Sequence, residues 1–231
     1  MKASTPALLL YIVSGFLFFL STIIDNEYLT LIAKPIISTS IFFYYWQESH
    51  GKVNFWFSSI IILFFASGIF TLFEDEFALQ YVILINFVAY CILLAFIIRS
   101  LFELRIKSIN NYNLAYIIFM LLFLSSLLYM CLFLVFDSTS DLFIIVYTVI
   151  LLIIGVLTVL LYSLKNTREN IYLMMTIFCF IICDLFDVIY YYDYDFIFFR
   201  YVSILCNIVS FYFLVNYFLL KKENRENDEV Y

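Results

Sequence analysis

The stretch from Leu142 to Leu164 reads LFIIVYTVILLIIGVLTVLLYSL and contains no charged residue. A helix rises about 1.5 Å per residue, so a helix of this length can cross the roughly 30 Å hydrocarbon core of a bilayer. The whole chain has the same character, because 66% of its 231 residues are hydrophobic and only 13% are charged. Soluble domains are about 45–50% apolar. The sequence therefore predicts an integral membrane protein.

Seven further stretches are similar in length and apolar character. Together they predict an all-α, polytopic membrane protein, a bundle of eight transmembrane helices that forms one domain over residues 1–220. The connections are short, so consecutive helices are expected to run antiparallel. The charged tail, residues 221–231, is expected to be cytoplasmic and disordered. The expected spans are Pro6–Ile24, Tyr28–Trp46, Val53–Phe73, Phe77–Ile98, Leu114–Phe136, Leu142–Leu164, Ile171–Tyr190 and Phe196–Leu220.

The distribution of basic residues predicts the orientation of the bundle. Ten of the twelve Lys and Arg residues lie near the termini or in one set of alternate connections, and the other connections hold none. Cytoplasmic loops of membrane proteins carry an excess of Lys and Arg. Both termini are therefore predicted to be cytoplasmic, with a bacterial inner membrane as the expected location. The ten residues are Lys2, Lys52, Arg99, Arg105, Lys107, Lys165, Arg168, Lys221, Lys222 and Arg225.

Ionisable residues inside the predicted spans are the first candidates for a functional site. Lys34 is expected about 9 Å into the second span, and Asp184 about 9 Å from the outer end of the seventh. Asp187 lies nearer that end, and Arg200 is expected about 6 Å into the eighth span. Ionisable groups at membrane depth are costly and usually functional. All four residues fall in the outer third of the predicted bundle.

These charges allow two interpretations. Glu74 and Asp75 end the third span on the same side, so the helices can bring acids and bases together in a polar pocket. Pro35 favours the pocket, because a proline inside a helix kinks it and frees a backbone carbonyl. In that pocket Lys34 is expected to pair with a carboxylate, Asp184 first and Asp75 next. In the alternative, Lys34 extends to the membrane surface and the other charges only hold helices together.

Two motifs resemble those of the lysoplasmalogenase (YhhN-like) family of membrane proteins. That family has a Lys-Pro pair in its second span, matched here by Lys34-Pro35. It has a small residue followed by Asp in its seventh span, and Cys183-Asp184 is similar. Near the end of its third span the family has Gly-Asp, where this sequence has Phe70-Thr71 and its nearest acidic residues follow one turn later.

The resemblance implies an enzyme that hydrolyses the vinyl ether bond of a lysoplasmalogen, a single-chain lipid, to a fatty aldehyde and a glycerophospho-head-group alcohol. One acid would protonate the alkenyl carbon, and a second carboxylate would stabilise the resulting cation or activate water. No metal or other cofactor is implied. The candidate acid–base residues are Asp184, Asp75, Glu74 and Asp187, and the candidate phosphate-binding residues are Lys34 and Arg200.

Other function classes receive less support from the sequence. No basic patch interleaved with exposed aromatic residues occurs, so a nucleic-acid partner is not expected. The five cysteines all fall in apolar runs and are interpreted as packing residues, and His50, the only histidine, is interpreted as a solvated loop residue. The alternative from another class is a small membrane transporter or lipid-binding membrane protein that uses the same buried charges as a binding site.

Overall fold

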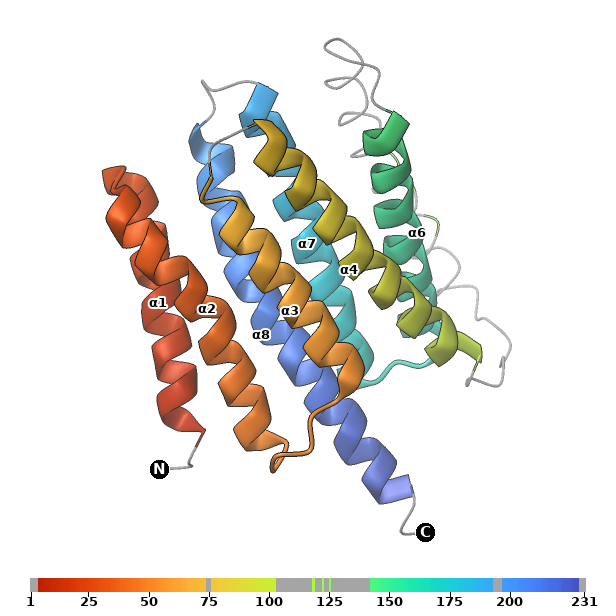
Figure 1. The fold of residues 1–231 in the computed structure, drawn as a ribbon. Coiled ribbons are helices and arrows are strands. Elements are labelled where there is room, and N and C mark those ends of the chain that lie inside the picture. Colours follow the sequence, from red (N-terminus) through yellow and green to blue (C-terminus); the bar gives the residue numbers. More distant parts are fainter. Residues whose placement is uncertain are drawn as a thin grey trace. The chain divides into compact units, whose positions relative to one another are not determined.

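The computed structural model describes residues 4–73, 76–102, 142–192 and 197–228, and also Ile118, Leu122 and Ser125. Every regular element in this part of the chain is an α-helix, and none of the described residues lies in a strand. Figure 1 shows these helices as coiled ribbons, with short connections at residues 25–26, 49–54 and 165–167. The all-α class predicted from the sequence is therefore confirmed for the described residues.

The chain divides into two compact units. The first unit comprises Met1–Ile92 and Val215–Tyr231, and the second comprises Leu93–Leu214. The first holds α1 (Thr5–Ile24), α2 (Glu27–Glu48), α3 (Phe55–Phe70) and most of α4 (Glu76–Phe102). The second holds α6 (Leu142–Leu164), α7 (Arg168–Tyr192) and the first part of α8 (Ile197–Asp228), whose last part belongs to the first unit.

The seven helices coincide with seven of the expected spans. The remaining one, Leu114–Phe136, lies outside the described residues apart from three isolated helical positions. α3 is apolar but has only 16 residues. α2 has the length of a span but is less apolar, since it includes Lys34, two glutamates and several Ser and Thr residues. Within the described residues, five helical stretches are long and apolar enough to cross a membrane: Thr5–Ile24, Tyr81–Phe102, Val146–Leu164, Arg168–Asp187 and Ile197–Asn224.

The charged tail differs from expectation, because α8 continues to Asp228. The prediction of disorder is therefore wrong for residues 221–228. Lys, Glu and Arg are good helix formers, so a polar composition does not by itself end a helix. The tail is also attached to the first unit, where Lys222 Nζ donates to the backbone oxygen of Ser49 at 2.6 Å. Lys221 lies over the Tyr217 ring, with its Nζ 5.6 Å from the ring centroid.

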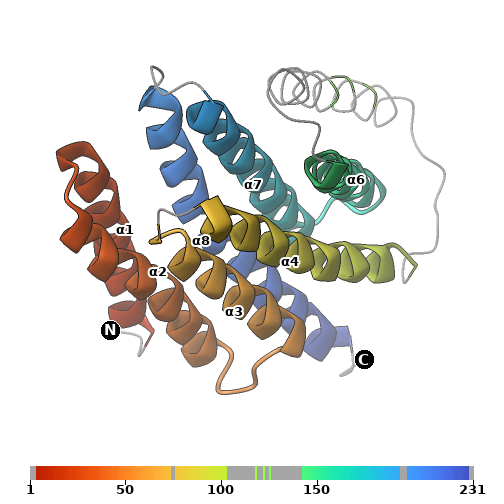
Figure 2. The same ribbon diagram turned by 45° about the horizontal axis from the view of Figure 1, so that its top comes forward.

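Small and hydroxyl-bearing residues line the contact between α1 and α2, which lie side by side in Figures 1 and 2. Gly15 and Ser21 on α1 and Ala33 on α2 are buried. Small residues let helix backbones approach closely where lipid offers no hydrophobic driving force between helices. The Ser21 and Thr30 hydroxyl oxygens are 2.8 Å apart and join the two helices near their connection.

Candidate functional site: a polar seam between α7 and α8

Polar side chains form a continuous row where α7 meets α8 in the second unit. The row has helical spacing on both sides, with residues i, i+4 and i+7 on α7 and i, i+3 and i+7 on α8, so each set shares one helix face. The contacts pair earlier α7 residues with later α8 residues, as expected for antiparallel helices. We call these six residues the polar seam: Cys183, Asp187 and Tyr190 on α7, and Arg200, Ser203 and Asn207 on α8.

Aromatic contacts fix the same register on either side of the seam. Phe180 on α7 meets Phe211 on α8 edge to face, with ring centroids 6.0 Å apart. The Phe186 and Phe199 rings are 4.9 Å apart and pack on Leu185 and Ile189. Because these apolar contacts hold the two helices in one register, the polar residues opposite each other are held in place as well.

The inner part of the seam directs hydrogen-bond donors at a carboxylate. The Ser203 hydroxyl donates to Asp187 Oδ1, and the Cys183 thiol lies 3.7 Å from Asp187 Oδ2. Cys183 Sγ is also 3.3 Å from the Ser203 oxygen and accepts from Asn207 Nδ2 at 3.5 Å. Cys183 and Ser203 are only 3% and 1% exposed, whereas Asp187 is exposed. The carboxylate thus lies at the edge of a buried polar cluster.

The seam presents a positioned cation where α7 ends and α8 begins. Arg200 Nη1 donates to the Tyr190 hydroxyl at 3.0 Å. The guanidinium also lies over the Tyr190 ring, 5.1 Å from its centroid, a distance at which the ring face attracts a cation. A guanidinium has five N–H donors, and this hydrogen bond uses one of them. A planar cation held in this way can bind an oxyanion such as a phosphate.

Asp184 contacts α6, whereas Asp187 in the polar seam contacts α8. Tyr147 on α6 donates its hydroxyl hydrogen to Asp184 Oδ2 at 2.7 Å, and Asp184 is half-buried. Asp187, one turn further along α7, accepts instead from Ser203 on α8. The two predicted acid–base residues therefore lie together on α7, each with its own hydroxyl donor. Figure 2 shows α6 beside α7, the arrangement that makes the Tyr147 contact possible.

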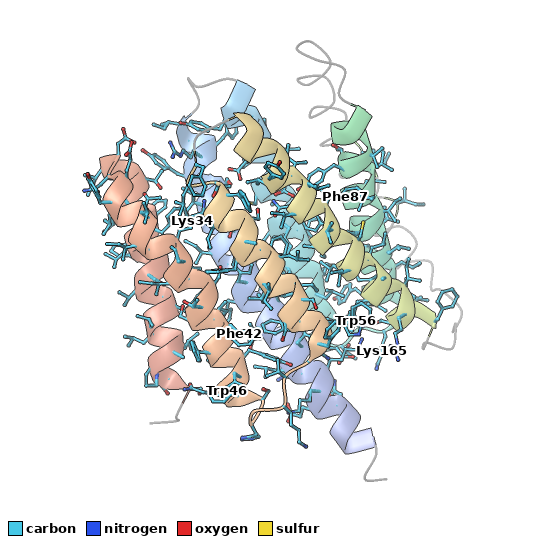
Figure 3. All side chains as sticks on the ribbon, in the orientation of Figure 1. Lys34, Phe42, Trp46, Trp56, Phe87 and Lys165 are labelled. Carbon is cyan, nitrogen blue, oxygen red and sulfur yellow. The ribbon has the colours of Figure 1, made fainter. Side chains whose placement is uncertain are left out.

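Lys34 lies in the first unit, among α1, α2 and α3. Its Nζ donates to the Thr71 hydroxyl just after α3 and lies 5.5 Å from the centroid of the Phe18 ring on α1. Gly68 lies beside this side chain, and a Cβ there would be in ordinary van der Waals contact with Lys34 Cε at 3.8 Å. Figure 3 labels Lys34 on α2, nearer the start of the helix than Phe42 or Trp46. The lysine head group therefore lies at the end of α3, against a hydroxyl and an aromatic face.

The predicted site residues are thus distributed over both units. Asp184, Asp187 and Arg200 belong to the second unit, where they lie in or beside the polar seam. Lys34 belongs to the first unit, so its pairing with Asp184 stays a prediction. Glu74 and Asp75 lie outside the described residues.

Three residues of this region were not singled out from the sequence: Tyr147, Ser203 and Asn207. Ser203 and Asn207 left a signal, since they are polar, four residues apart and on the same face as Arg200 in an otherwise apolar span. Tyr147 left none, because a tyrosine in an apolar run looks like any other aromatic residue. Its partner is 37 residues away in the sequence.

In comparisons with known proteins, no family model, curated protein or solved structure matches the chain. The functional argument therefore rests on the side chains of the described residues. In the second unit this is a pair of carboxylates with hydroxyl donors, together with Arg200, which lies one helical turn from Ser203 and is held by Tyr190. Such a group can transfer protons and bind a polar head group.

Proposed function

We propose that this chain is a membrane-embedded hydrolase that cleaves the vinyl ether bond of a single-chain lipid, the reaction of the lysoplasmalogenases that its motifs resemble. The observation that carries the proposal is the half-buried Asp184, which lies in an apolar helix with Tyr147 as its donor and Asp187 one turn away. Vinyl ether hydrolysis needs a positioned acid and a group that activates water. Two carboxylates at this spacing suit both tasks.

The proposed reaction has balanced proton transfers. Asp184, in its acid form, gives its proton to the alkenyl carbon, which leaves a cation shared by the adjacent carbon and the ether oxygen. Water adds to that carbon and gives its proton to the Asp187 carboxylate, forming a hemiacetal. Asp187 then protonates the leaving ether oxygen while Asp184 takes the hemiacetal hydroxyl proton. The carbon–oxygen bond breaks, aldehyde and alcohol leave, and both aspartates return to their starting forms.

The neighbouring residues are assigned supporting roles. Tyr147 and Ser203 are positioning residues, because each donates a hydrogen bond to one of the two carboxylates. Arg200 lies one turn from Ser203 on α8, at the end of the polar seam where α8 begins. We assign it to the lipid phosphate, with Tyr190 fixing the orientation of its guanidinium.

A contact in the first unit also supports the resemblance. Lys34 belongs to the Lys-Pro motif of the second span, and Thr71 occupies the position at which the family has the Asp of its Gly-Asp motif. These two side chains are hydrogen bonded to each other. The positions that correspond to two motifs of the family are therefore in contact within the first unit. This chain has a hydroxyl at the position where the family has a carboxylate.

Aldehyde release is the direct test of this function. Purified protein in detergent or vesicles is expected to release fatty aldehyde from lysoplasmalogen. The matched lysolipid with a saturated ether bond is expected to stay intact, because it has no alkenyl carbon to protonate. Folded protein that binds lysolipid without releasing aldehyde would contradict hydrolysis and would favour the alternative, a transporter or lipid-binding membrane protein that uses the same charges.

The proposal includes eight transmembrane helices with both termini in the cytoplasm of a bacterial cell. Its support is the ten-to-none distribution of basic residues between alternate connections. In intact cells, a cysteine that replaces Ser138 should react with an impermeant thiol reagent, and one that replaces Asn166 should not. The parent protein, with its five native cysteines, is the control. Labelling at position 166 and none at position 138 would overturn the orientation.

A further inference from the structure

The first unit contains a groove between α1 and α2. None of the groove residues belongs to the site formed by Asp184 and Asp187 in the second unit. The groove has a volume of about 420 Å³. Its walls are mainly apolar and include Pro6, Ala7 and Leu10 from α1 and Ile36 and Phe43 from α2. These residues come from the beginning of α1 and from α2 between Ile36 and Gln47, so the groove lies towards the end of the helix pair that carries the turn between α2 and α3.

The groove leads to an exposed tryptophan and a tight turn. Phe43 in the groove wall meets Trp46 edge to face, with ring centroids 6.4 Å apart. Trp46 is 45% exposed, and its indole nitrogen would lie 3.8 Å from a Cβ on Gly51. Gly51 has a φ of +76° and donates to the Trp46 backbone oxygen at 3.0 Å. Trp46 therefore connects the groove to the turn that follows α2.

Two lysines contribute positive charge at this turn. Lys52 is exposed in the turn, and Lys222 reaches the same turn through its bond to the Ser49 backbone oxygen. Lys221 precedes it on α8. The acidic group that follows Trp46 on α2 is Glu48, whose carboxylate accepts from the Ser4 hydroxyl. An apolar groove with an exposed tryptophan and an exposed lysine at its end has the chemical character of a membrane–water interface, where Trp is enriched and Lys attracts anionic head groups.

One polar atom in the groove wall also favours a lipid ligand. Gln47 lines the groove, and its side-chain oxygen is buried without a hydrogen-bond partner among the described residues. A buried acceptor without a donor is unfavourable. A hydroxyl group on a bound lipid, such as that of a glycerol head group, would supply the donor.

We propose that this end of the first unit binds an anionic membrane lipid, with one acyl chain in the α1–α2 groove and the phosphate at Lys52 beside Trp46. The site does not depend on the proposed hydrolase function, because none of its residues belongs to the polar seam. The occupant is inferred from charge complementarity between the exposed Lys52 and the phosphate of an anionic lipid. The lipid would act as a bound structural partner of the first unit.

The molecule carries its own reporter for this site. The chain has two tryptophans, Trp46 and Trp56, and Figure 3 shows both at the turn end of α2 and α3. Trp56→Phe leaves Trp46 as the only tryptophan. This protein is placed in phosphatidylcholine vesicles that contain increasing amounts of either brominated phosphatidylglycerol or brominated phosphatidylcholine, and the quenching of Trp46 fluorescence is measured. The anionic lipid is expected to reach half-maximal quenching at about a fivefold lower mole fraction, from a favourable contribution of about 1 kcal/mol per Lys near an anionic surface.

Three further variants locate the site on the same Trp56→Phe background. Lys52→Gln should remove most of the anionic preference. Lys165→Gln removes the same charge from the second unit, where Lys165 pairs with Glu169 at 3.6 Å, and should leave the preference unchanged. Ala7→Phe places a ring in the groove and should weaken quenching by phosphatidylglycerol brominated on its acyl chains. Circular dichroism and size-exclusion chromatography verify that each variant is folded.

The outcomes that overturn the proposal are distinct. Equal quenching by the two lipids in the parent would mean that the site does not select anionic head groups. A preference that survives Lys52→Gln, or that Lys165→Gln abolishes equally, would remove Lys52 as the phosphate ligand. Unchanged quenching in a folded Ala7→Phe variant would exclude the groove as the acyl-chain site. Salt provides the same test without mutation, because 0.5 M NaCl should reduce the preference if exposed charge causes it.

Discussion

The α1–α2 and α7–α8 contacts are both made by helices that follow each other along the chain, yet they use polar residues in different ways. Between α1 and α2, most hydroxyl groups donate to backbone oxygens of their own helix, as Ser14 does to Tyr11 at 3.0 Å and Ser40 to Ile36 at 2.6 Å. Such hydroxyls are satisfied before the helices meet. Side-chain contacts that cross this pair lie near its two ends, where Ser4 donates to Glu48 and Ser21 meets Thr30, and the small residues between them provide the packing.

Between α7 and α8, polar side chains of one helix bond to side chains of the other. Ser203 donates to Asp187, and Arg200 to Tyr190. A carboxylate or guanidinium in an apolar span is costly unless its partners are in place, so this helix pair depends on one register. The presence of polar residues is therefore a weak guide to function in a membrane helix. The informative feature is whether their bonds stay within one helix or cross to another.

The largest expected effect comes from Asp184, which carries the proposed acid. Asp184→Asn keeps the size of the side chain and removes the proton that the reaction uses. We expect turnover of lysoplasmalogen to fall by about a hundredfold or more, the usual scale for an acid–base group. The protein should still fold, because Tyr147 can donate to the amide oxygen. The measurement is aldehyde release together with a thermal melt.

Two results would contradict this assignment. A folded Asn variant with full activity would remove Asp184 from the mechanism and leave Asp187, Glu74 and Asp75 as candidates. A variant that expresses poorly or melts at a much lower temperature would indicate that Asp184 is structural. Tyr147→Phe is the matched control for position, since it removes the donor but leaves the carboxylate. It should lower turnover less than Asp184→Asn does.

An intermediate effect is expected at Lys34, whose partners lie in the first unit. Lys34→Met keeps the length of the side chain but removes its bond to Thr71 and its attraction to the Phe18 ring. We expect a loss of about 1–2 kcal/mol in the free energy of unfolding, from the hydrogen bond and the cation–π contact together. Activity should also fall if Lys34 binds the substrate phosphate.

Thr71→Val is the control for this prediction, because it removes only the hydroxyl that Lys34 contacts. It should lose less stability than Lys34→Met, since the contact with Phe18 remains. Equal stability of Lys34→Met and the parent would show that the lysine extends to the membrane surface, the alternative left open by the sequence.

The sequence predicts where the described helices lie, because long apolar runs separated by short polar segments mark them. α6 begins and ends at the residues of the quoted stretch, and α2 exceeds its expected span by only a few residues. The end of α8 was mispredicted for a physical reason. Polar composition indicates that a segment can leave the membrane, but it does not decide whether the helix continues in water, which depends on propensity and on contacts such as Lys222 with Ser49.

The candidate site is only partly predictable, because sequence and register contribute different parts of it. Asp184, Asp187 and Arg200 can be found by inspection, since each interrupts an apolar run at membrane depth. Their hydroxyl partners cannot be assigned in the same way. Ser203 lies 16 residues from Asp187, and Tyr147 lies 37 from Asp184. Those contacts depend on how the helices are aligned, and aromatic pairs such as Phe180–Phe211 fix that alignment.

The smallest effects are expected from a matched pair of serines, one in each helix contact. Ser203→Ala and Ser21→Ala delete the same atom at positions that are both almost fully buried. Ser203 donates across the contact to a carboxylate, so its loss should lower the free energy of unfolding by about 1–2 kcal/mol. Ser21 donates to the backbone oxygen of Phe18 on its own helix and meets Thr30. Its loss should have a smaller effect of about 0.5 kcal/mol, typical of polar contacts between membrane helices.

The two serine variants test the comparison more directly than the larger changes do, because neither removes a charge. Reversible unfolding of the two variants and the parent in mixed detergent micelles gives both differences under one condition. The ratio is more informative than either value, since errors of extrapolation affect the two variants alike. If Ser21→Ala is as destabilising as Ser203→Ala, a hydroxyl that meets another hydroxyl across the contact matters as much as one that donates to a carboxylate. The distinction between a packing contact and a functional one would then rest on the carboxylates alone.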